Sequence, residues 1–157
     1  TCDQPINSVD LYPTLLALAG AKPPANYTLD GTSYLSLLTS GGKGALNRDT
    51  IYWYFPGYLG AGQGGWRTLP VGVVRSGDWK LLEFFEDDRL ELYNVREDIS
   101  EKDNLASKLP DKVRELQDNL HRWRKQVNAR MPEPNRDRDP QAQKPKGRGQ
   151  RRAAEDE

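Results

Sequence analysis

Short apolar and aromatic segments, each bounded by turn residues, occupy the middle of the chain. TIYWYF, beginning at Thr50, is rich in β-branched and aromatic residues and ends at Pro56-Gly57. VGVVR, WKLLEFF and LELYNV follow from Val71, and short turns that contain Gly or Asp separate them. Because short turns join successive strands as hairpins, the pattern predicts an antiparallel meander of about four strands.

A helical pattern follows the predicted sheet. It begins at Pro110, a residue that suits the first turn of a helix, and its apolar stripe consists of Val113, Leu116, Leu120, Trp123 and Val127. Steps of three and four place the stripe on one side of a helix, which would cover one face of the sheet in a two-layer arrangement. We expect Trp123 to be buried there, and His121 to be a partly exposed surface residue.

Two weaker helical patterns precede the sheet. SVDLYPTLLALAG predicts a short helix with Ser8 as N-cap and Gly20 as C-terminal stop, while Pro13 predicts a tightened or kinked start. Its apolar face consists of Leu11, Leu15, Leu16 and Leu18. Further on, TSYLSLLTSGG predicts a second short helical or irregular segment that ends in glycines.

Charge and composition exclude several classes of partner. Among the 157 residues, Lys plus Arg and Asp plus Glu both number 23, so the balance predicts no nucleic acid as partner. No apolar run approaches the ~20 residues of a membrane span, and TCDQPINSVD at the start lacks the features of an export signal. Residues 135–157 contain no apolar residue larger than Ala, which predicts a disordered charged tail.

Few residues of the chain are suited to catalysis. Cys2 is the only cysteine and His121 the only histidine, so a Cys/His zinc site would lack ligands and a catalytic triad would need a helical His. We therefore expect neither catalytic residues nor a metal site in this chain. Aromatic side chains do gather around a glycine-rich loop, where they could stack on sugar rings: Tyr52, Trp53, Tyr54, Tyr58 and Trp66.

An ordered series of segments resembles the last third of sulfatases of the arylsulfatase A type. The segments are DLYPTLLALAG, LDGTSYLSLL, VGVVRSGDWKLL, ELYNVREDISEKDNLA and MPEPN. The resemblance implies an α/β protein whose local architecture here is α+β. Residues 1–48 would close an alkaline-phosphatase-like α/β domain, and 49–134 would form a C-terminal subdomain of antiparallel sheet plus helix, ahead of the tail.

The resemblance also implies the hydrolysis of sulfate esters, with the chemistry located elsewhere. Sulfatases of this type use a formylglycine made within a C-x-P-S-R motif, together with a calcium ion, and both belong to the N-terminal domain. CDQPI has neither the Ser nor the Arg of that motif, so Cys2 is not the formylglycine precursor. We expect the formylglycine and the calcium in an N-terminal part that this chain lacks, and we expect the chain alone to be inactive.

Two positions depart from the family pattern. Where many relatives read W-H-Y-P-H-Y, this chain reads WYFPGY from Trp53, without either histidine. Where the family often reads D-P-x-E, the chain has Asp98-Ile99-Ser100-Glu101. The first departure bears on the choice of substrate.

The predicted role of the segment is to shape the substrate entrance. We expect Tyr54, Tyr58, Trp66 and Arg67 to contact a sulfated small molecule or polysaccharide, with Arg67 as the only cation of the loop from Pro56 to Pro70. The family habit implies a periplasmic or extracellular location. A stand-alone module that binds carbohydrate or protein through its aromatic loop remains the alternative. An upstream reading frame with a C-x-P-S-R motif would favour the sulfatase.

Overall fold

The computed structural model describes residues 2–60 and 68–133. The chain divides into two compact units, Thr1–Asp49 and Thr50–Glu157. Each unit has its own architecture, and each is described by itself.

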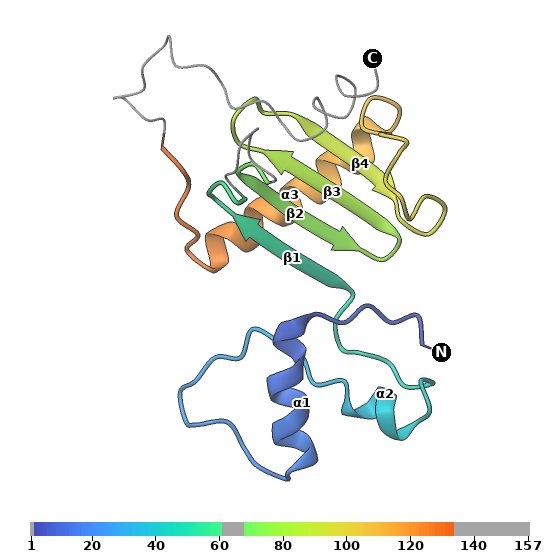
Figure 1. The fold of residues 1–157 in the computed structure, drawn as a ribbon, viewed down its shortest axis with the longest axis vertical. Helices are drawn as coiled ribbons and strands as arrows, with labels where there is room; N and C mark the ends of the chain where they lie inside the picture. The colour runs from blue at the N-terminus through green and yellow to red at the C-terminus, as the bar shows by residue number, and fades with distance from the viewer. Residues whose placement is uncertain (1, 61–67, 134–157) are drawn as a thin grey trace. The chain divides into compact units, whose positions relative to one another are not determined.

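The second unit is a four-stranded antiparallel sheet with one long helix against it, as the sequence predicts. Strands β1 (Thr50–Phe55), β2 (Val71–Ser76), β3 (Trp79–Phe84) and β4 (Leu90–Asn94) lie in the order β1-β2-β3-β4. Each strand therefore pairs with its neighbour in sequence. Helix α3 (Pro110–Gln126) lies along one face of this sheet (Figure 1).

The core of this unit lies between α3 and a row of paired strand residues. Pairing places Val74 on β2 opposite Leu81 on β3, and Leu81 opposite Leu92 on β4. All three are completely buried, and they pack against Val113, Leu116 and Leu120 of the helix. Gly72 on β2 permits a close approach, because a Cβ there would lie 3.1 Å from the ring of Phe85 and 3.2 Å from Leu120.

The end of the helical stripe is less buried than its pattern predicts. Trp123 is only half-buried, and its ring stacks on the ring of Tyr52. Val127 follows the last residue of α3 and is 52% exposed. The expectation of a fully buried Trp123 is wrong because β1 is the edge strand, so solvent reaches the outer side of the stacked pair.

The first unit contains a 3₁₀ turn and two short helices: η1 (Ser8–Asp10), α1 (Leu11–Leu18) and α2 (Leu35–Thr39). The tightened start predicted from Pro13 is confirmed by the 3₁₀ turn ahead of α1. The predicted N-cap is wrong by one residue. Asn7 is the cap, and its own N–H donates to the Asp10 carboxylate at 2.6 Å, which completes a capping box.

Asp10 is the centre of the first unit. Its carboxylate is completely buried and accepts two hydrogen bonds from the Arg48 guanidinium, at 2.6 and 2.7 Å, and one from the N–H of Thr32 at 2.8 Å. Burial acts to raise the pKa of Asp10, but these hydrogen bonds and the charge of Arg48 hold that pKa below its ordinary value of 3.8. The ionised carboxylate therefore ties three separate segments together.

Gly31 makes this arrangement possible. A Cβ at that position would lie 2.1 Å from the carbonyl oxygen of Val9, so only glycine allows the backbone to pass so close. A direct hydrogen bond also joins the two helical segments: the N–H of Tyr34 donates to the Thr14 hydroxyl at 3.1 Å. The segments DLYPT and LDGTSY are thus two sides of one contact.

The apolar face predicted for the first helix is exposed within the described residues. Leu11, Leu15 and Leu18 are each more than half exposed. The side of α1 that is buried carries Pro13 and Thr14 instead. Burying a Leu side chain stabilises a fold by ~1.5–3 kcal/mol. The three exposed leucines contribute only part of that stabilisation to this unit.

Candidate functional site

The predicted site residues lie where β1 ends and the glycine-rich loop begins. The isolated bridge between Leu59 and Thr68 closes the base of this loop through two backbone hydrogen bonds of 3.2 Å. Trp66 and Arg67 lie outside the described residues, directly before Thr68. The structure places the other two, Tyr54 and Tyr58, on β1 and just beyond it.

Tyr54 is half-buried and contacts the segment that follows α3. Its hydroxyl donates a hydrogen bond to the carbonyl of Arg130 and lies 3.8 Å from the sulfur of Met131. Its ring packs against Phe85, with centroids 5.8 Å apart. Burial raises the pKa of the Tyr54 phenol above its ordinary value of 10.0, against the lowering influence of the Arg124 charge. The phenol is therefore a neutral hydrogen-bond donor.

Tyr58 is 42% exposed and links the loop to the turn between β3 and β4. Its hydroxyl donates to Glu86 Oε1 at 2.7 Å. Because Leu59 is next to it, the bridge and the Tyr58 hydrogen bond together hold the first residues of the loop in place. The exposed ring offers an aromatic surface for stacking, while the hydroxyl keeps its orientation.

A cluster of polar side chains that the sequence did not reveal joins α3 to β3. Glu83 Oε1 accepts a hydrogen bond from Gln117 at 2.9 Å and lies 2.8 Å from His121 Nε2. Glu83 Oε2 forms an ion pair of 2.7 Å with Arg124, and both of these side chains are 12% exposed. The helical spacing of 117, 121 and 124 was visible in the sequence as a polar stripe, but its partner on the strand was not.

The charge of Glu83 is maintained by its partners. Burial acts to raise the pKa of this carboxyl, but the hydrogen bonds from Gln117 and His121 and the charge of Arg124 hold the pKa below its ordinary value of 4.5. The guanidinium of Arg124 also lies 5.3 Å from the centre of the Phe85 ring. This cluster anchors the helix beside Tyr54. His121 is exposed as predicted, yet it is engaged with a carboxylate.

Residues of the departing segment Asp98-Ile99-Ser100-Glu101 have structural roles. Asp98 accepts hydrogen bonds from the N–H groups of Lys102 and Asp103, at 2.7 and 2.9 Å. Glu101 forms a 2.6 Å ion pair with Lys80 on β3. Asp98 therefore shapes the segment after β4 from within, and Glu101 fastens that segment to the sheet.

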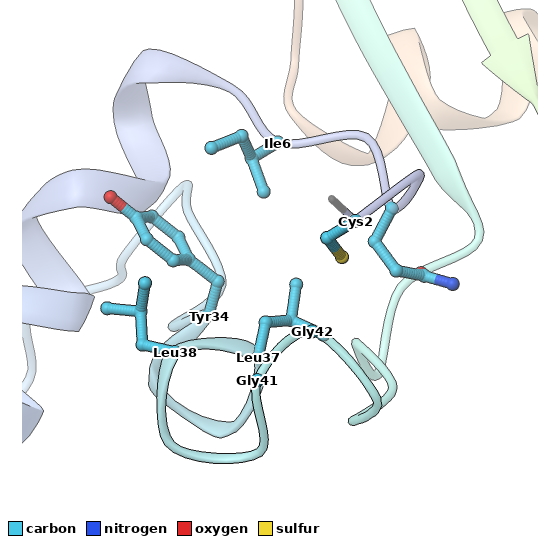
Figure 2. Close-up of a pocket in the computed structure, with 8 residues that line it drawn as sticks. Cys2, Ile6, Tyr34, Leu37, Leu38, Gly41 and Gly42 are labelled. Carbon is cyan, nitrogen blue, oxygen red and sulfur yellow. The ribbon is translucent and has the colours of Figure 1, made fainter.

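A cavity of about 410 Å³ lies within the first unit. Figure 2 shows the side chains of Ile6, Tyr34 and Leu37 around it, with Cys2 on the opposite side. Its lining is mostly apolar, and none of the predicted site residues belongs to it. Cys2 itself is an exposed free thiol.

The acidic and imidazole side chains of the described residues do not gather into a metal site. Within residues 2–60 and 68–133, no group of three or more His, Cys, Asp or Glu side chains is placed to hold one. The Asp10 carboxylate is paired with Arg48, and the Glu83 carboxylate accepts from Gln117 and is paired with Arg124, so these two groups do not fit a calcium site. In the same part of the chain, no helix is both long and apolar enough to cross a bilayer.

Comparison with known protein families shows which family the chain belongs to. A model of the family described as N-sulphoglucosamine sulphohydrolase, C-terminal, matches residues 1–130. The chain belongs to the sulfatase family. It is a C-terminal sulfatase segment, and its sheet and helix have the architecture of the corresponding part of solved sulfatases.

Relatives of known sequence or structure are about four times longer than the matching region. A sulfatase of Formosa agariphila is 32% identical over 138 residues, which cover 80% of this chain and 24% of that protein. A protein solved in complex with its substrate D-glucosamine-2-N,6-O-disulfate has 27% identity and a TM-score of 0.63, over 78% of this chain and 24% of its own. Another, solved with k-i-k-neocarrahexaose, has 27% identity and a TM-score of 0.57, over 76% and 24%.

Proposed function

We propose that this sulfatase segment is part of an enzyme that hydrolyses sulfate esters of saccharides, and that it shapes the substrate entrance. The observation that carries the proposal is the family match over residues 1–130. The region spans about 24% of the length of its relatives. The formylglycine nucleophile and the calcium ion would then belong to the preceding catalytic domain. That domain is the main proposed partner, and a periplasmic or extracellular location follows the habit of the family.

A saccharide is favoured as the substrate over a small aryl sulfate. Two of the similar solved structures are complexes, one with D-glucosamine-2-N,6-O-disulfate and one with k-i-k-neocarrahexaose. The exposed ring of Tyr58 next to the loop base suits contact with the apolar face of a sugar. Arg67 would supply a cation for a sulfate group and Trp66 a second stacking surface.

Tyr54 would act on the substrate site indirectly, without contacting the substrate. Its hydroxyl is engaged with the Arg130 carbonyl, and its ring packs on Phe85. We assign it to positioning the end of β1, from which Tyr58 and the loop follow. The role of Tyr54 in the entrance is thus to fix the loop base rather than to recognise sulfate.

The test compares a large and a small substrate in the enzyme extended to include its preceding domain. Trp66→Ala, Arg67→Ala and Tyr58→Ala should each lower kcat/KM for a sulfated oligosaccharide and leave kcat/KM for a chromogenic aryl sulfate nearly unchanged. Remote contacts alter substrate capture without altering the chemical step. Ile99→Ala, at an 80% exposed position in the loop after β4, is the matched control.

Two results would count against this proposal. An equal loss on both substrates would indicate a folding defect instead of lost contacts. Unchanged kinetics on both substrates would remove the loop from the substrate entrance.

A further inference from the structure

The turn between β3 and β4 lies at the same end of the sheet as the glycine-rich loop. Because neighbouring strands are antiparallel in the order β1-β2-β3-β4, β1 and β3 run in the same direction and end on the same side (Figure 1). β1 leads into the loop that begins at Pro56, and β3 leads into the turn 85–89. Two strand spacings, ~10 Å in total, separate β1 from β3, so a long side chain can connect the two segments.

This turn contacts both ends of the loop. The N–H of Phe85 donates to the carbonyl of Pro70 at 3.0 Å, and the hydroxyl of Tyr58 donates to Glu86 Oε1 at 2.7 Å. Tyr58 precedes the Leu59–Thr68 bridge and Pro70 follows it. Two consecutive residues of one turn therefore fasten the segment before the bridge and the segment after it.

The conformation of the turn is determined by its own contacts. The N–H of Phe84 donates to the carbonyl of Arg89 at 3.0 Å, which closes the turn, and Asp88 adopts the left-handed conformation with φ 53°. Aspartate tolerates this region better than most residues do. The Arg89 guanidinium lies 3.7 Å over the centre of the Phe84 ring and pairs with Asp87 at 3.4 Å. The backbone that carries Glu86 is therefore well defined.

The hydrogen bond between Tyr58 and Glu86 fixes an orientation more than it stabilises the fold. Tyr58 is 42% exposed and Glu86 is exposed, so water competes for both groups and the net contribution of the bond to stability is small. Gly57 precedes Tyr58, and a Cβ at Gly57 would meet open space, so packing at that residue does not direct the tyrosine. A bond at the far end of the ring does direct it, and it sets which way the ring face points for stacking on a sugar.

A carboxylate at this position is unsuited to direct contact with a sulfate ester. Glu86, Asp87 and Asp88 are consecutive acidic residues, and negative charges of this kind repel a sulfate group. Recognition of the sulfate itself would need a cation or N–H donors. The role that fits Glu86 is therefore the one that the structure shows, the acceptor for the Tyr58 hydroxyl.

We propose that Glu86 is a positioning residue of the substrate entrance, which holds the Tyr58 ring in the orientation that stacks on a sugar of the sulfated substrate. This inference rests on the proposed function, because it assigns Glu86 to the same entrance. Glu86 contacts the tyrosine and not the substrate, so its removal should weaken capture of an oligosaccharide and leave the chemical step unchanged. A binding group that is already oriented costs less to order when the substrate binds.

The test is steady-state kinetics of the enzyme extended to include its upstream coding region. Glu86→Ala should raise KM for a sulfated oligosaccharide about 2- to 10-fold, the range expected for ordering one side chain on binding, with kcat unchanged. Tyr58→Phe keeps the ring and removes the donor, so it should have the same effect. The double variant should be no worse than either single variant, because both changes remove one interaction. Glu86→Gln keeps an acceptor oxygen and should retain most of the parent affinity.

Asp88→Asn is the matched control. It removes one negative charge from the same turn, and asparagine tolerates the positive φ at this position. KM for the oligosaccharide should stay at the parent value in this variant. A fall of KM in both Glu86→Ala and Asp88→Asn would mean that the charge of the turn repels the substrate, which would overturn the positioning role. Additive effects of Glu86→Ala and Tyr58→Phe would also overturn it.

Hydrogen exchange, followed by mass spectrometry on the same proteins, separates this inference from the proposed function. The N–H groups of Leu59 and Thr68 donate across the bridge at 3.2 Å, and they should exchange severalfold faster in Glu86→Ala than in the parent. Unchanged exchange together with unchanged KM would overturn the inference alone, since Tyr58→Ala tests the proposed function. Faster exchange with unchanged KM would show that the loop base moves without consequence for the substrate, which would overturn the inference and the proposed entrance role together.

Discussion

The ring of Tyr52 lies flat on the ring of Trp123, with centroids 4.8 Å apart and planes 4° apart. This pair joins the edge strand β1 to the last turns of α3. It lies beside the fully buried cluster of Val74, Leu81 and Leu120, so it closes the core at the open edge of the sheet.

Trp123→Ala should therefore lower the free energy of unfolding by about 2–3 kcal/mol, less than the ~3–5 kcal/mol of a fully buried aromatic. Trp123→Phe keeps a ring for the stack and should lose less than about 1.5 kcal/mol. Urea denaturation followed by circular dichroism measures both. A loss within about 0.5 kcal/mol for the Ala variant would mean that the helix end does not pack on β1.

The Asp10–Arg48 pair should determine the stability of the first unit. Asp10→Asn leaves a buried guanidinium without its countercharge, which we expect to cost about 3 kcal/mol. The methyl signals of Thr14 and Thr32 in an NMR titration with urea report on this unit directly. If these signals are lost at the same urea concentration in the variant and in the parent protein, the Asp10–Arg48 pair does not stabilise the first unit.

The same pair predicts a pH dependence. The folded-state pKa of Asp10 lies below the ordinary value of 3.8, so the unfolded chain binds a proton first as the pH falls. The stability from this group is fully present above pH 3.8 and is lost as the pH drops through the folded-state pKa. Asp10→Asn should remove this part of the acid sensitivity. An equally steep acid transition in the variant would assign the sensitivity to other carboxyls.

Glu83 on β3 should stabilise the second unit much more than an exposed carboxylate of α3 does. Glu83→Gln breaks the Arg124 ion pair and should cost about 2 kcal/mol, below the ~3–5 kcal/mol of a fully buried pair because Arg124 keeps Phe85 as a neighbour. The control is Glu115→Gln, which removes an exposed pair with Lys112 and should change stability by less than about 0.5 kcal/mol. Equal losses in thermal melts would contradict the role of the cluster.

The elements of the fold could be predicted because their signals are local. The β-rich segments, the turns between them and the stripe from Val113 to Leu120 each lie within a few residues of the structure that they determine. The N-cap was missed by one residue because both Asn7 and Ser8 are good caps, and only the Asp10 carboxylate, which accepts from the Asn7 N–H, distinguishes them.

The contacts of the candidate site could not be predicted in this way. Glu83 and His121 are 38 residues apart, and Tyr54 and Arg130 are 76 apart, so no periodicity connects them. The partner of Tyr54 is a backbone carbonyl, which every residue has and which no residue type reveals. Trp66 and Arg67 lie outside the described residues, and their roles remain predictions.

The release of sulfate tests the central claim most directly. Inorganic sulfate should be measured with a sulfated oligosaccharide and with an aryl sulfate, for the 157-residue chain and for the protein that includes its upstream coding region. We expect release by the longer protein and none above buffer by the chain alone, because a reaction this slow needs positioned charge and a nucleophile. Sulfate release by the chain alone, or its absence in the longer protein with a formylglycine verified by mass spectrometry, would contradict the account.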